Sequence, residues 1–522
     1  MKVNTIRQYQ ILIIRAYEGR GYINNLIGAY KEAINDYKMM AVLAGDDRAI
    51  LFRANLKLAE AYRNLGSFKI GLMALAEASK FLGGNKVNVL YGKAEISVLK
   101  SWIFRIKGDY QKALDSGSYA LKTAKYLLNF VIKRSSSELI DKQEVLKLLG
   151  KSHNNLGVAF WSNGDYNRAV KHFNKNLKIS LKIGDKQALG IALGNLGIAY
   201  YYLGNHKRAT NLFLSSLKIL EQIGDKQRIG TAYGNLGNIY SDNAEYDKAI
   251  IFHEKNLNIS KEINNRMELA RAYGNLGLVY YNKGNFDKAI ELNKKDLKIS
   301  HKLKNVYGVS RAANNLGAIY NEIGKYKKAI ECAKIQLNMV AKTGEKEGEG
   351  TAYCSLGNAF LEMGNLKQAQ KFLLLAEKIF RKIRHKEQLL SSCLIIANLH
   401  LNKGNFKRAF DYAKEGLILA RALGSKSYRA NCFVIFGLLY SKKCNFRKSA
   451  KNFQKAIAIF SEIKQNKKLA DTYYEYAKML QKGFDLGFYP NNRAKKYLNK
   501  AFEIYQALKL RHKIKEIKMW NM

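Results

Sequence analysis

Histidine and cysteine are the residues of this sequence best suited to nucleophilic, acid–base or metal chemistry. The eight histidines are scattered among different positions, and neither an HExxH motif nor a paired-cysteine spacing occurs. His385 and Glu387 form a lone His-x-carboxylate pair with no third ligand nearby in sequence. The recurring GNLG wording lacks the Gly-Lys-Ser/Thr of a phosphate-binding loop and falls within a predicted helix, where backbone amides are already bonded. We therefore predict a non-catalytic protein with no metal or other cofactor.

The five cysteines predict free thiols. Their number is odd and none follows CxxC spacing; they are Cys332, Cys354, Cys393, Cys432 and Cys444. Near the N-terminus, the apolar run from Ile11 to Ile14 is too short for a signal peptide or a membrane span. We expect a reducing compartment and a cytoplasmic protein with no transmembrane segment.

A phrase of forty residues repeats along most of the chain and must form the elements that position any site. Leucine followed by glycine recurs at this period, and an aromatic residue stands three places after each glycine. The pairs are Leu156-Gly157, Leu196-Gly197, Leu236-Gly237, Leu276-Gly277, Leu316-Gly317 and Leu356-Gly357. Leucine with an aromatic residue four positions on makes one apolar helix stripe. Glycine inside a helix costs about 1 kcal/mol relative to alanine, so its recurrence predicts a close approach of neighbouring helices.

A second set of glycines predicts the turn into a second helix. These glycines suit a left-handed helix C-cap, and they are Gly164, Gly204, Gly284, Gly324, Gly364 and Gly404. An alanine five residues later marks the close crossing of the second helix, and Ala249 keeps this place after Ala244, which replaces the glycine. The second helix should end at Gly184, Gly224, Asn264 or Gly344, with Asp185 and Asp225 capping the next helix.

Leu-Gly, an aromatic residue, a turn glycine and an alanine at these spacings resemble the tetratricopeptide repeat, with its usual period of about 34 residues lengthened to 40. Wording such as "ARAYGNLG" is most similar to the long-repeat subgroup found in Pins/LGN adaptors and in bacterial scaffold and sensor proteins. The resemblance implies an all-α fold: a right-handed α-solenoid of about twelve helix hairpins, whose first helices line a concave groove.

The resemblance places ligand contact on the residue before the motif leucine. In five repeats this residue is asparagine, namely Asn155, Asn195, Asn235, Asn275 and Asn315. An amide offers a donor and an acceptor, so it can hold the backbone of an extended peptide. The alternative is that asparagine is the repeat consensus in an asparagine-rich sequence.

Arginine one helical turn before two of these amides predicts an acid-binding centre. Arg271 and Arg311 stand four residues before Asn275 and Asn315, where the related adaptors use arginine to grip acidic ligand residues. A guanidinium binds a carboxylate bidentately. Lys151 has the same offset in an earlier repeat.

Two further offsets on the first helix carry candidate ligand contacts. One offset is shared by Asn238, Asn358 and Asn398, and another, three residues later, by Trp161, Tyr201 and Tyr281. The aromatic residues either anchor a ligand side chain or pack against the adjacent repeat.

The regularity of the repeat sequence divides the chain into three segments. Residues 1–132 hold three divergent units, residues 133–466 hold the regular array, and residues 467–522 hold a terminal unit and a basic helix. The stretch "KRSSSELIDKQ" at 133–143 predicts a short hinge and a lengthened first helix. In residues 508–520, apolar residues at helical spacing predict a cap on the solenoid, with binding to a membrane or an acidic partner as the alternative.

The chain is strongly basic, with 89 basic against 42 acidic residues and a formal net charge of +47. Such a surface attracts acidic proteins, nucleic acid or anionic lipid. The abundance of Lys, Asn, Ile and Tyr is also what an AT-rich genome imposes. Lysine inside the groove would favour an acidic ligand, whereas lysine spread over the second helices would favour genomic bias.

These features support a leading function and two others. The leading hypothesis is a protein–protein interaction scaffold or adaptor that binds an extended or helical, acidic partner segment in its concave groove. The second is a basic nucleic-acid-binding solenoid, whose affinity would fall steeply with salt. The third is a ligand- or peptide-sensing regulator whose superhelix closes around its ligand.

Overall fold

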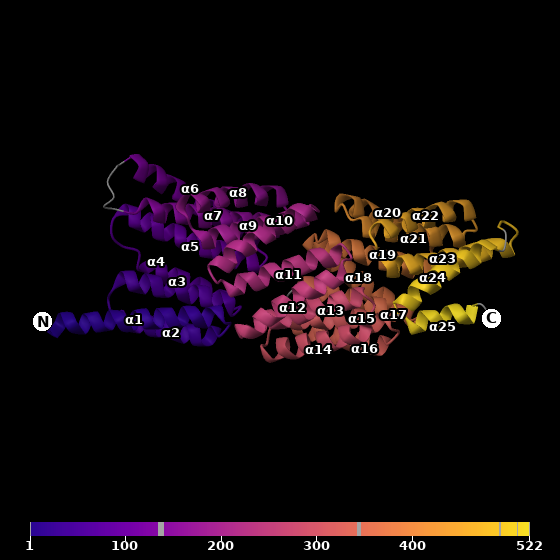
Figure 1. Ribbon diagram of the computed structural model, residues 1–522, viewed down its shortest axis with the longest axis horizontal. Helices are drawn as coiled ribbons and strands as arrows, with labels where there is room; N and C mark the ends of the chain where they lie inside the picture. Colours follow the sequence, from indigo (N-terminus) through magenta and orange to yellow (C-terminus); the bar gives the residue numbers. More distant parts are fainter. Residues whose placement is uncertain (1, 134–139, 342–345, 490–491, 509, 521–522) are drawn as a thin grey trace. The chain divides into compact units, whose positions relative to one another are not determined.

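The computed structural model describes residues 2–133, 140–341, 346–489, 492–508 and 510–520. Within these residues the chain forms 25 α-helices and no strand (Figure 1). Helices α1 to α24 follow one another as twelve successive pairs, and α25 comes last. The prediction of an all-α solenoid of about twelve hairpins is therefore confirmed.

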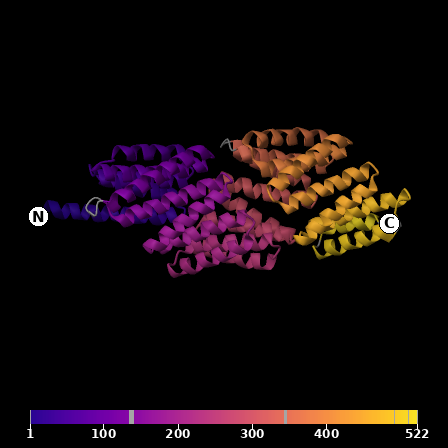
Figure 2. The ribbon, with the colours of Figure 1, turned by 90° about the horizontal axis from the view of Figure 1, so that it is seen from above.

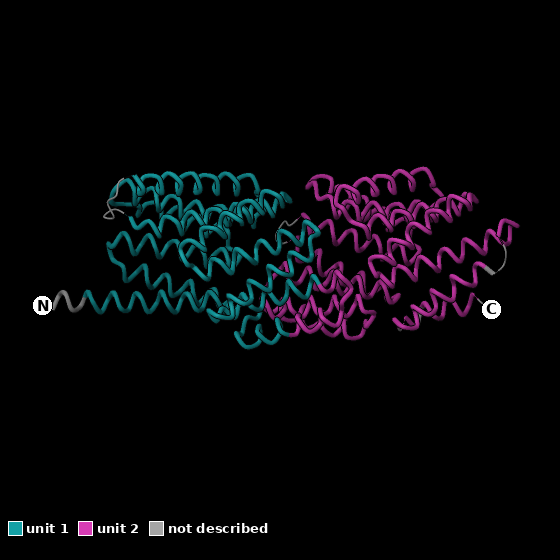
Figure 3. Tube along the Cα trace, turned by 45° about the horizontal axis from the view of Figure 1, so that its top comes forward, with its two compact units in different colours: residues 1–239, 255–266 teal, residues 240–254, 267–522 magenta. Residues whose placement is uncertain are grey.

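The helices belong to two compact units (Figure 3). Unit 1 consists of residues 1–239 and 255–266, and unit 2 of residues 240–254 and 267–522. Unit 1 holds α1 (Lys2–Leu26), α2 (Tyr30–Leu43), α3 (Arg48–Asn64), α4 (Phe68–Lys80), α5 (Lys86–Ile106), α6 (Tyr110–Lys133), α7 (Lys142–Ser162), α8 (Tyr166–Ile183), α9 (Lys186–Tyr202) and α10 (His206–Gln222). Three helices have residues in both units: α11 (Lys226–Asp242), α12 (Tyr246–Glu262) and α13 (Arg266–Asn282).

Unit 2 contains the remaining helices. They are α14 (Phe286–Lys302), α15 (Val306–Glu322), α16 (Tyr326–Ala341), α17 (Lys346–Glu362), α18 (Leu366–Ile383), α19 (Lys386–Asn402), α20 (Phe406–Ala422), α21 (Lys426–Lys442), α22 (Phe446–Glu462), α23 (Asn466–Asp485), α24 (Asn492–Ala507) and α25 (Arg511–Trp520). We call the odd-numbered helices from α1 to α23 first helices and the even-numbered ones second helices. The three segments expected from the repeat wording, 1–132, 133–466 and 467–522, differ from these units and stay a prediction.

The turn inside each hairpin has the predicted left-handed backbone. Gly164 and Gly284 adopt φ of 79° and 83°, a region in which a side chain is strained. Ala244 and Cys444 hold the same conformation, with φ of 59° and 53°, without being glycine. The residue after the turn caps the second helix: the side chain of Asp165 accepts a hydrogen bond from a backbone N–H in the first turn of α8.

The turn between hairpins also follows the sequence. Gly184, Gly224 and Asn264 have φ of 68°, 67° and 51°. The side chains of Asp185 and Asp225 each accept a hydrogen bond from the backbone N–H three residues later, at 2.9 and 3.1 Å, so both cap the next first helix as predicted. The remaining predicted helix end, Gly344, lies outside the described residues.

The repeated glycine of the first helix lies against the second helix of its own hairpin. A Cβ atom added at Gly157 would lie 2.5 Å from the ring of Phe173, and one at Gly357 would lie 2.5 Å from Cγ of Leu373. Both distances are too short for any side chain, which confirms the predicted close approach. Gly317 is an exception, because the nearest atom would lie 3.5 Å away, an ordinary contact distance.

The alanines of the second helices lie in the core, as expected for a close crossing. Six are fully buried and the seventh is 3% exposed; in sequence order they are Ala169, Ala209, Ala249, Ala289, Ala329, Ala369 and Ala409. Most core clusters draw their residues from adjacent hairpins, as where Ala409 packs with Leu390 and Phe436. Apolar burial is therefore local along the chain, as in other solenoids.

The first helices lie on the inner side of each unit's curve. Neighbouring first helices contact one another in the pairs α3/α5, α5/α7 and α7/α9 of unit 1, and α15/α17, α17/α19, α19/α21 and α21/α23 of unit 2. Among the described helices, no two neighbouring second helices approach as closely. Because a stack curves toward its shorter side, we call the surface of the first helices the inner face; Figure 2 shows the layered hairpins from above.

The irregular ends of the array match two expectations from the sequence. Helix α7 has 21 residues against 17 for α9, which confirms the lengthened first helix, while residues 134–139 of the predicted hinge lie outside the described residues. At the other end, Leu510 and Ile517 are 1% and 2% exposed and pack on the core of hairpin α23/α24. The basic segment thus covers the apolar face of the last hairpin, as a cap does.

Two buried histidines pair within hairpin α7/α8. His153 Nδ1 lies 3.1 Å from His172 Nδ1, and the ring of Phe160 lies against His172. Burial lowers the pKa of His153 to about 3 and that of His172 to about 4, and the charges of Lys175 and Lys125 act in the same direction. Both rings are therefore neutral at pH 7, with one ring nitrogen donating to the other.

Acid should destabilise unit 1 through this pair. Because the pKa values of the folded state lie below the ordinary 6.5, the unfolded chain binds more protons between about pH 4 and 6.5, and stability falls as the pH falls through that window. After allowance for partial solvent screening, we expect the free energy of unfolding to drop between pH 7 and 4.5 by roughly 1 kcal/mol for each histidine. Urea titrations should show a weaker pH dependence in His172→Gln and an unchanged one in the control His206→Gln.

The glycine contacts predict opposite effects of one substitution at two equivalent sites. Gly357→Ala should destabilise unit 2 because the new methyl group would collide with Leu373. Gly317→Ala should be neutral or stabilising by up to about 1 kcal/mol, because its methyl group has room and alanine favours the helix. Chemical denaturation of the two variants compares them directly. Equal destabilisation would contradict the role of close packing.

Candidate functional site

A cleft of about 280 Å³ opens on the inner face of unit 2 between α19 and α21. It is lined by Ser391, Leu394, Ile395 and Asn398 of α19 and by Tyr428, Asn431, Val434, Ile435 and Leu438 of α21. On each helix the lining residues recur at the spacing i, i+3, i+4 and i+7, which is one helical face. Two adjacent first helices therefore form the walls of the cleft.

The cleft combines an apolar floor with a polar rim. Leu394 and Ile435 are 7% and 3% exposed and form part of the core beneath it. Asn398 is exposed and Asn431 half-buried, and neither amide makes a hydrogen bond to another described residue. Burial raises the pKa of Tyr428 to about 12, so its hydroxyl stays protonated. Such a site can take an apolar side chain and bind the peptide backbone beside it.

The lining residues occupy the same repeat offsets as the groove residues expected from the sequence. Ser391 and Asn431 stand at the offset of Arg271, and Ile395 and Ile435 stand at the offset of the five predicted groove asparagines. The cleft thus lies at the offsets where the sequence predicts a groove, with apolar side chains in place of the expected amides, and ligand binding at these offsets stays a prediction. A change from amide to β-branched residues at one offset was the signal in the sequence that would have located this cleft.

Two of the five predicted amides make hydrogen bonds inside unit 1. Asn155 is 3% exposed and its Nδ2 donates to the carbonyl oxygen of Val98 at 2.6 Å. Asn195 is half-buried and donates to Oδ1 of Asn154, on the preceding first helix, at 2.7 Å. The expectation that Asn155 lines a groove is corrected, because a buried amide that joins α7 to α5 has no free surface.

The other three amides differ among themselves. Asn315 Nδ2 donates to Oδ1 of Asn293, on the second helix of the preceding hairpin, at 3.0 Å. Asn235 and Asn275 are half-buried and make no hydrogen bond to another described residue. These two amides retain free donors and acceptors on the inner side of α11 and α13.

Arg311 binds a carboxylate of its own chain. Its Nη2 and Nε atoms lie 2.8 and 3.3 Å from Oδ2 of Asp296, which is fully buried. Ser300 donates to the other carboxylate oxygen at 2.9 Å, and a Cβ atom at Gly274 would fall 2.5 Å from Oδ2. Burial raises the pKa of Asp296, and the charge of Arg311 opposes that rise. The predicted acid-binding arginine is thus an interhelical structural contact.

Arg271 and Lys151 keep more of their surface. The side chain of Arg271 is 42% exposed and pairs with Glu268 one turn earlier on α13. Lys151 is exposed on α7, where its charge opposes the burial that raises the pKa of Glu95. Of the cationic residues expected in the groove, these two remain accessible to a ligand.

The third predicted amide offset is accessible at one member. Asn238 and Asn358 are half-buried on α11 and α17. Asn398 is exposed and lines the cleft between α19 and α21. The structure therefore brings this single predicted residue into the described cleft.

The three predicted aromatic residues pack within the chain. Trp161 meets Tyr202 edge to face, with ring centroids 5.3 Å apart, and Tyr201 meets Tyr202 in the same way at 5.2 Å. In unit 2, the hydroxyl of Tyr281 donates to Glu322 at 3.4 Å. Trp161 and Tyr281 thus contact the adjacent repeat, whereas Tyr201 contacts a residue of its own helix. A role of these residues in ligand binding stays a prediction.

Comparisons with known proteins agree with this geometry. Residues 148–222, 228–300 and 308–382 match the family model described as tetratricopeptide repeat. These three segments are thus similar to tetratricopeptide repeats. A solved Rap protein, crystallised with competence and sporulation factor, has 14% sequence identity and a TM-score of 0.50 over 73% of this chain and 99% of its own. Aspartyl phosphate phosphatase F from Bacillus subtilis has 15% identity and a TM-score of 0.48 over 71% and 94% of the two chains. A search of curated proteins found no match.

Positive charge lies mainly on the second helices of the regular repeats. From α7 to α22, the first helices carry 14 lysine and arginine residues and the second helices carry 32. The inner face is therefore not the most basic surface of the repeats. By the criterion set from the sequence, this distribution favours a compositional origin of the charge over an acid-seeking groove.

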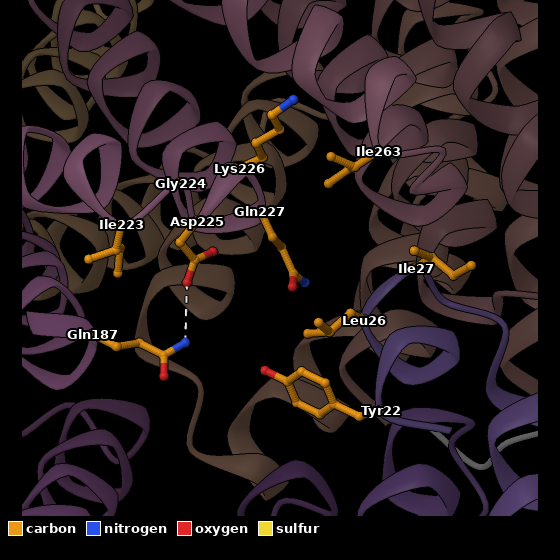
Figure 4. A pocket seen from close by; sticks show the side chains of 10 residues that line it. All are labelled: Tyr22, Leu26, Ile27, Gln187, Ile223, Gly224, Asp225, Lys226, Gln227 and Ile263. Carbon is orange, nitrogen blue, oxygen red and sulfur yellow. Dashed lines mark hydrogen bonds between the residues drawn. The ribbon is translucent and has the colours of Figure 1, made fainter. Parts of the chain in front are cut away.

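Unit 1 contains a larger cleft at the edge of its repeats (Figure 4). It measures about 510 Å³ and lies between the end of α1, with Tyr22 and Leu26, and the turn before α11 with the first residues of that helix, including Ile223 and Gln227. A hydrogen bond of 3.4 Å from Gln187 to Asp225 crosses one wall. Its lining residues are helix ends and turns, so it lacks the two continuous helix faces that form the cleft in unit 2.

The described residues also limit two other kinds of site. No group of three or more His, Cys, Asp or Glu side chains among them is placed to hold a metal ion. None of the described helices has both the length and the hydropathy needed to cross a membrane. The protein's non-catalytic character stays a prediction.

The Arg311–Asp296 pair predicts that two arginines at one repeat offset differ in importance for stability. Arg311→Ala would leave the buried carboxylate of Asp296 without its partner, and we expect a loss of about 3 kcal/mol or more. Arg271→Ala breaks an exposed pair and should cost less than about 1 kcal/mol. Chemical denaturation of the two variants provides the comparison, and similar losses would contradict a structural role specific to Arg311.

Proposed function

We propose that this tetratricopeptide-repeat protein is a binding scaffold whose inner face in unit 2 takes up a segment of a partner protein. The carrying observation is the cleft between α19 and α21, in which apolar residues from two first helices meet below a rim of free amides. An apolar side chain of the partner would fill the cleft, because burying such a group there removes apolar surface from water on both sides.

The rim supports an extended partner segment. Asn398 and Asn431 project from neighbouring first helices, and each can donate to and accept from a peptide backbone. An extended peptide needs such partners at intervals, since its own backbone groups are unpaired. The half-buried Asn275 of α13 offers a further amide on the same unit.

We also propose that the partner is acidic and that the positive charge attracts it from a distance, not mainly through contacts in the groove. The net charge of +47 attracts an acidic molecule from a distance, but the basic residues lie mainly on the second helices. Charge would then raise the association rate more than it would hold the bound segment. Arg271 is the accessible arginine for a direct contact.

The Rap protein that shares the fold was crystallised with competence and sporulation factor. We propose by analogy of fold that this chain also binds a separate factor, either as an adaptor or as a sensor. A nucleic-acid-binding solenoid is the competing function, and the basic second helices would be its surface.

A peptide library displayed on phage tests the proposal with the purified full chain. Selected peptides should share an apolar residue. Their dissociation constants should rise about ten-fold or more in Ile395→Glu, because a charge would enter the apolar cleft. The matched control is Leu278→Glu, at the offset of Asn398 but 45% exposed on α13, where we expect little change.

Two results would contradict the proposal. One is a set of selected peptides with no common apolar residue. The other is an equal loss of affinity in Leu278→Glu and Ile395→Glu. Fluorescence anisotropy with single-stranded RNA distinguishes the competing function, for which affinity must fall by orders of magnitude between low and physiological salt and be unaffected by Ile395→Glu.

A further inference from the structure

The first helices of unit 2 form a closed circuit. Helices α15, α17, α19, α21 and α23 contact one another in sequence, and α23 then returns to α15. The return contact is an ion pair in which Nζ of Lys467 lies 2.5 Å from Oε1 of Glu322 and 2.8 Å from Oδ2 of Asp471. Since the two ends of the circuit come from opposite ends of unit 2, repeat stacking alone does not account for this contact.

The polar groups around Lys467 form one network. Tyr281 of α13 donates to Glu322 at 3.4 Å, and Tyr505 of α24 donates to Asp471 at 2.7 Å. Burial by itself would lower the pKa of Lys467. The carboxylates of Asp471 and Glu322 have the larger effect, so the pKa of the ammonium group is raised. Hydrogen bonds and charges thus join the last hairpin to α13 and α15.

An apolar contact lies beside this network. A Cβ atom at Gly284 would lie 3.0 Å from the carbonyl oxygen of Leu508, and Phe286 packs on the core of hairpin α23/α24. At the equivalent turn glycines of the next three hairpins, a Cβ atom would have no neighbour within 4 Å, so Gly284 differs from them in having a docked segment. The end of α24 therefore rests on the turn between α13 and α14.

The last hairpin is held differently on its two sides. Toward α22 it stacks through a buried apolar cluster that includes Phe460 and Leu469. Toward α13 to α15 the contact consists of the ion pair, with Lys467 32% and Glu322 18% exposed, the hydrogen bond of Tyr281, and the apolar contact of Leu508 and Phe286, which are both only partly buried. The closing contact is smaller and more polar than the stacking contact, so the circuit would open there first.

We propose that helices α23, α24 and α25 act as a clasp, which closes the first helices of unit 2 into a ring and limits the size of the molecule that can reach the α19/α21 cleft. This proposal rests on the proposed function in one respect, since it takes that cleft as the binding site. A free peptide end can thread into a closed ring, whereas a segment within a folded partner needs the clasp to open. Release of the clasp is therefore a regulatory step for bulky partners.

Thiol labelling of the full chain tests the clasp without any ligand. A cysteine is introduced by Asn398→Cys, and the exposed Cys444 is removed by Cys444→Ser. Four native cysteines remain, and all are buried. In this background the labelling rate of the introduced thiol is compared for N-ethylmaleimide and for a polyethylene-glycol maleimide of protein size.

The clasp predicts a change for the large reagent alone. Glu322→Gln removes the charge opposite Lys467, and we expect the large reagent to react about ten-fold faster while the small reagent is unchanged, because losing one partner of a half-buried pair weakens the contact. The matched control is Glu462→Gln, which removes the partner of Lys426 from an exposed pair on the same unit and should change neither rate. Leu508→Asp, a second variant, should act like Glu322→Gln by disrupting the apolar contact.

Two outcomes would overturn the clasp. The first outcome concerns the ratio of the labelling rates of the large and the small reagent. The clasp is wrong if this ratio, measured at the introduced thiol with the clasp residues unaltered, equals the ratio measured at Cys444 in the native chain. In the other, neither Glu322→Gln nor Leu508→Asp changes the rate of the large reagent. A failure of the peptide experiment would count against the proposed function and leave these rates unaffected, so the two proposals fail separately.

Discussion

The close approach of two helices within each hairpin is the constraint on which the rest of this structure depends. A first helix presents glycine, and a side chain such as Phe173 or Leu373 fills the space that a Cβ atom would need. Because interiors are densely packed, this contact fixes the distance between the two helices. Within each unit, a hairpin then stacks on the next through the buried alanines, and the first helices are drawn together on the inner face.

The fixed distance between helices also decides which polar groups remain free to bind a ligand. Asn155 and Arg311 belong to the offsets where a repeat protein presents its groove, yet both are bonded to groups of neighbouring helices. A buried carboxylate such as Asp296 requires its cation, since an unpaired charge in the interior is far more costly than an exposed one. Several polar groups of the inner face are therefore bonded within the chain, whereas Asn235 and Asn275 are not bonded to another described residue, and α19 and α21 carry apolar residues at the offset of these asparagines.

Closure of unit 2 gives its inner face a boundary that a simple stack would lack. The network around Lys467 connects helices that the chain separates by several hairpins, and it lies at the edge of the same inner layer that holds the cleft. Binding and closure would therefore involve one set of helices. In a solenoid, where each repeat touches mainly its neighbours, a single long-range contact of this kind can control the whole turn.

The sequence by itself determined the features that depend on residues within one repeat. Turn glycines such as Gly164, caps such as Asp185 and the glycine-to-ring contacts all arise from neighbours in the same or the next hairpin, so their spacing predicts them. Only the tertiary structure decided that Arg311 is held by Asp296, that α19 and α21 enclose the cleft, and that Lys467 meets Glu322. The first two contacts join adjacent hairpins, but they depend on side chains that change from one repeat to the next at the same offset, so the repeat pattern does not predict them. The contact of Lys467 with Glu322 depends on small rotations that accumulate over several hairpins, which no local pattern of residues encodes.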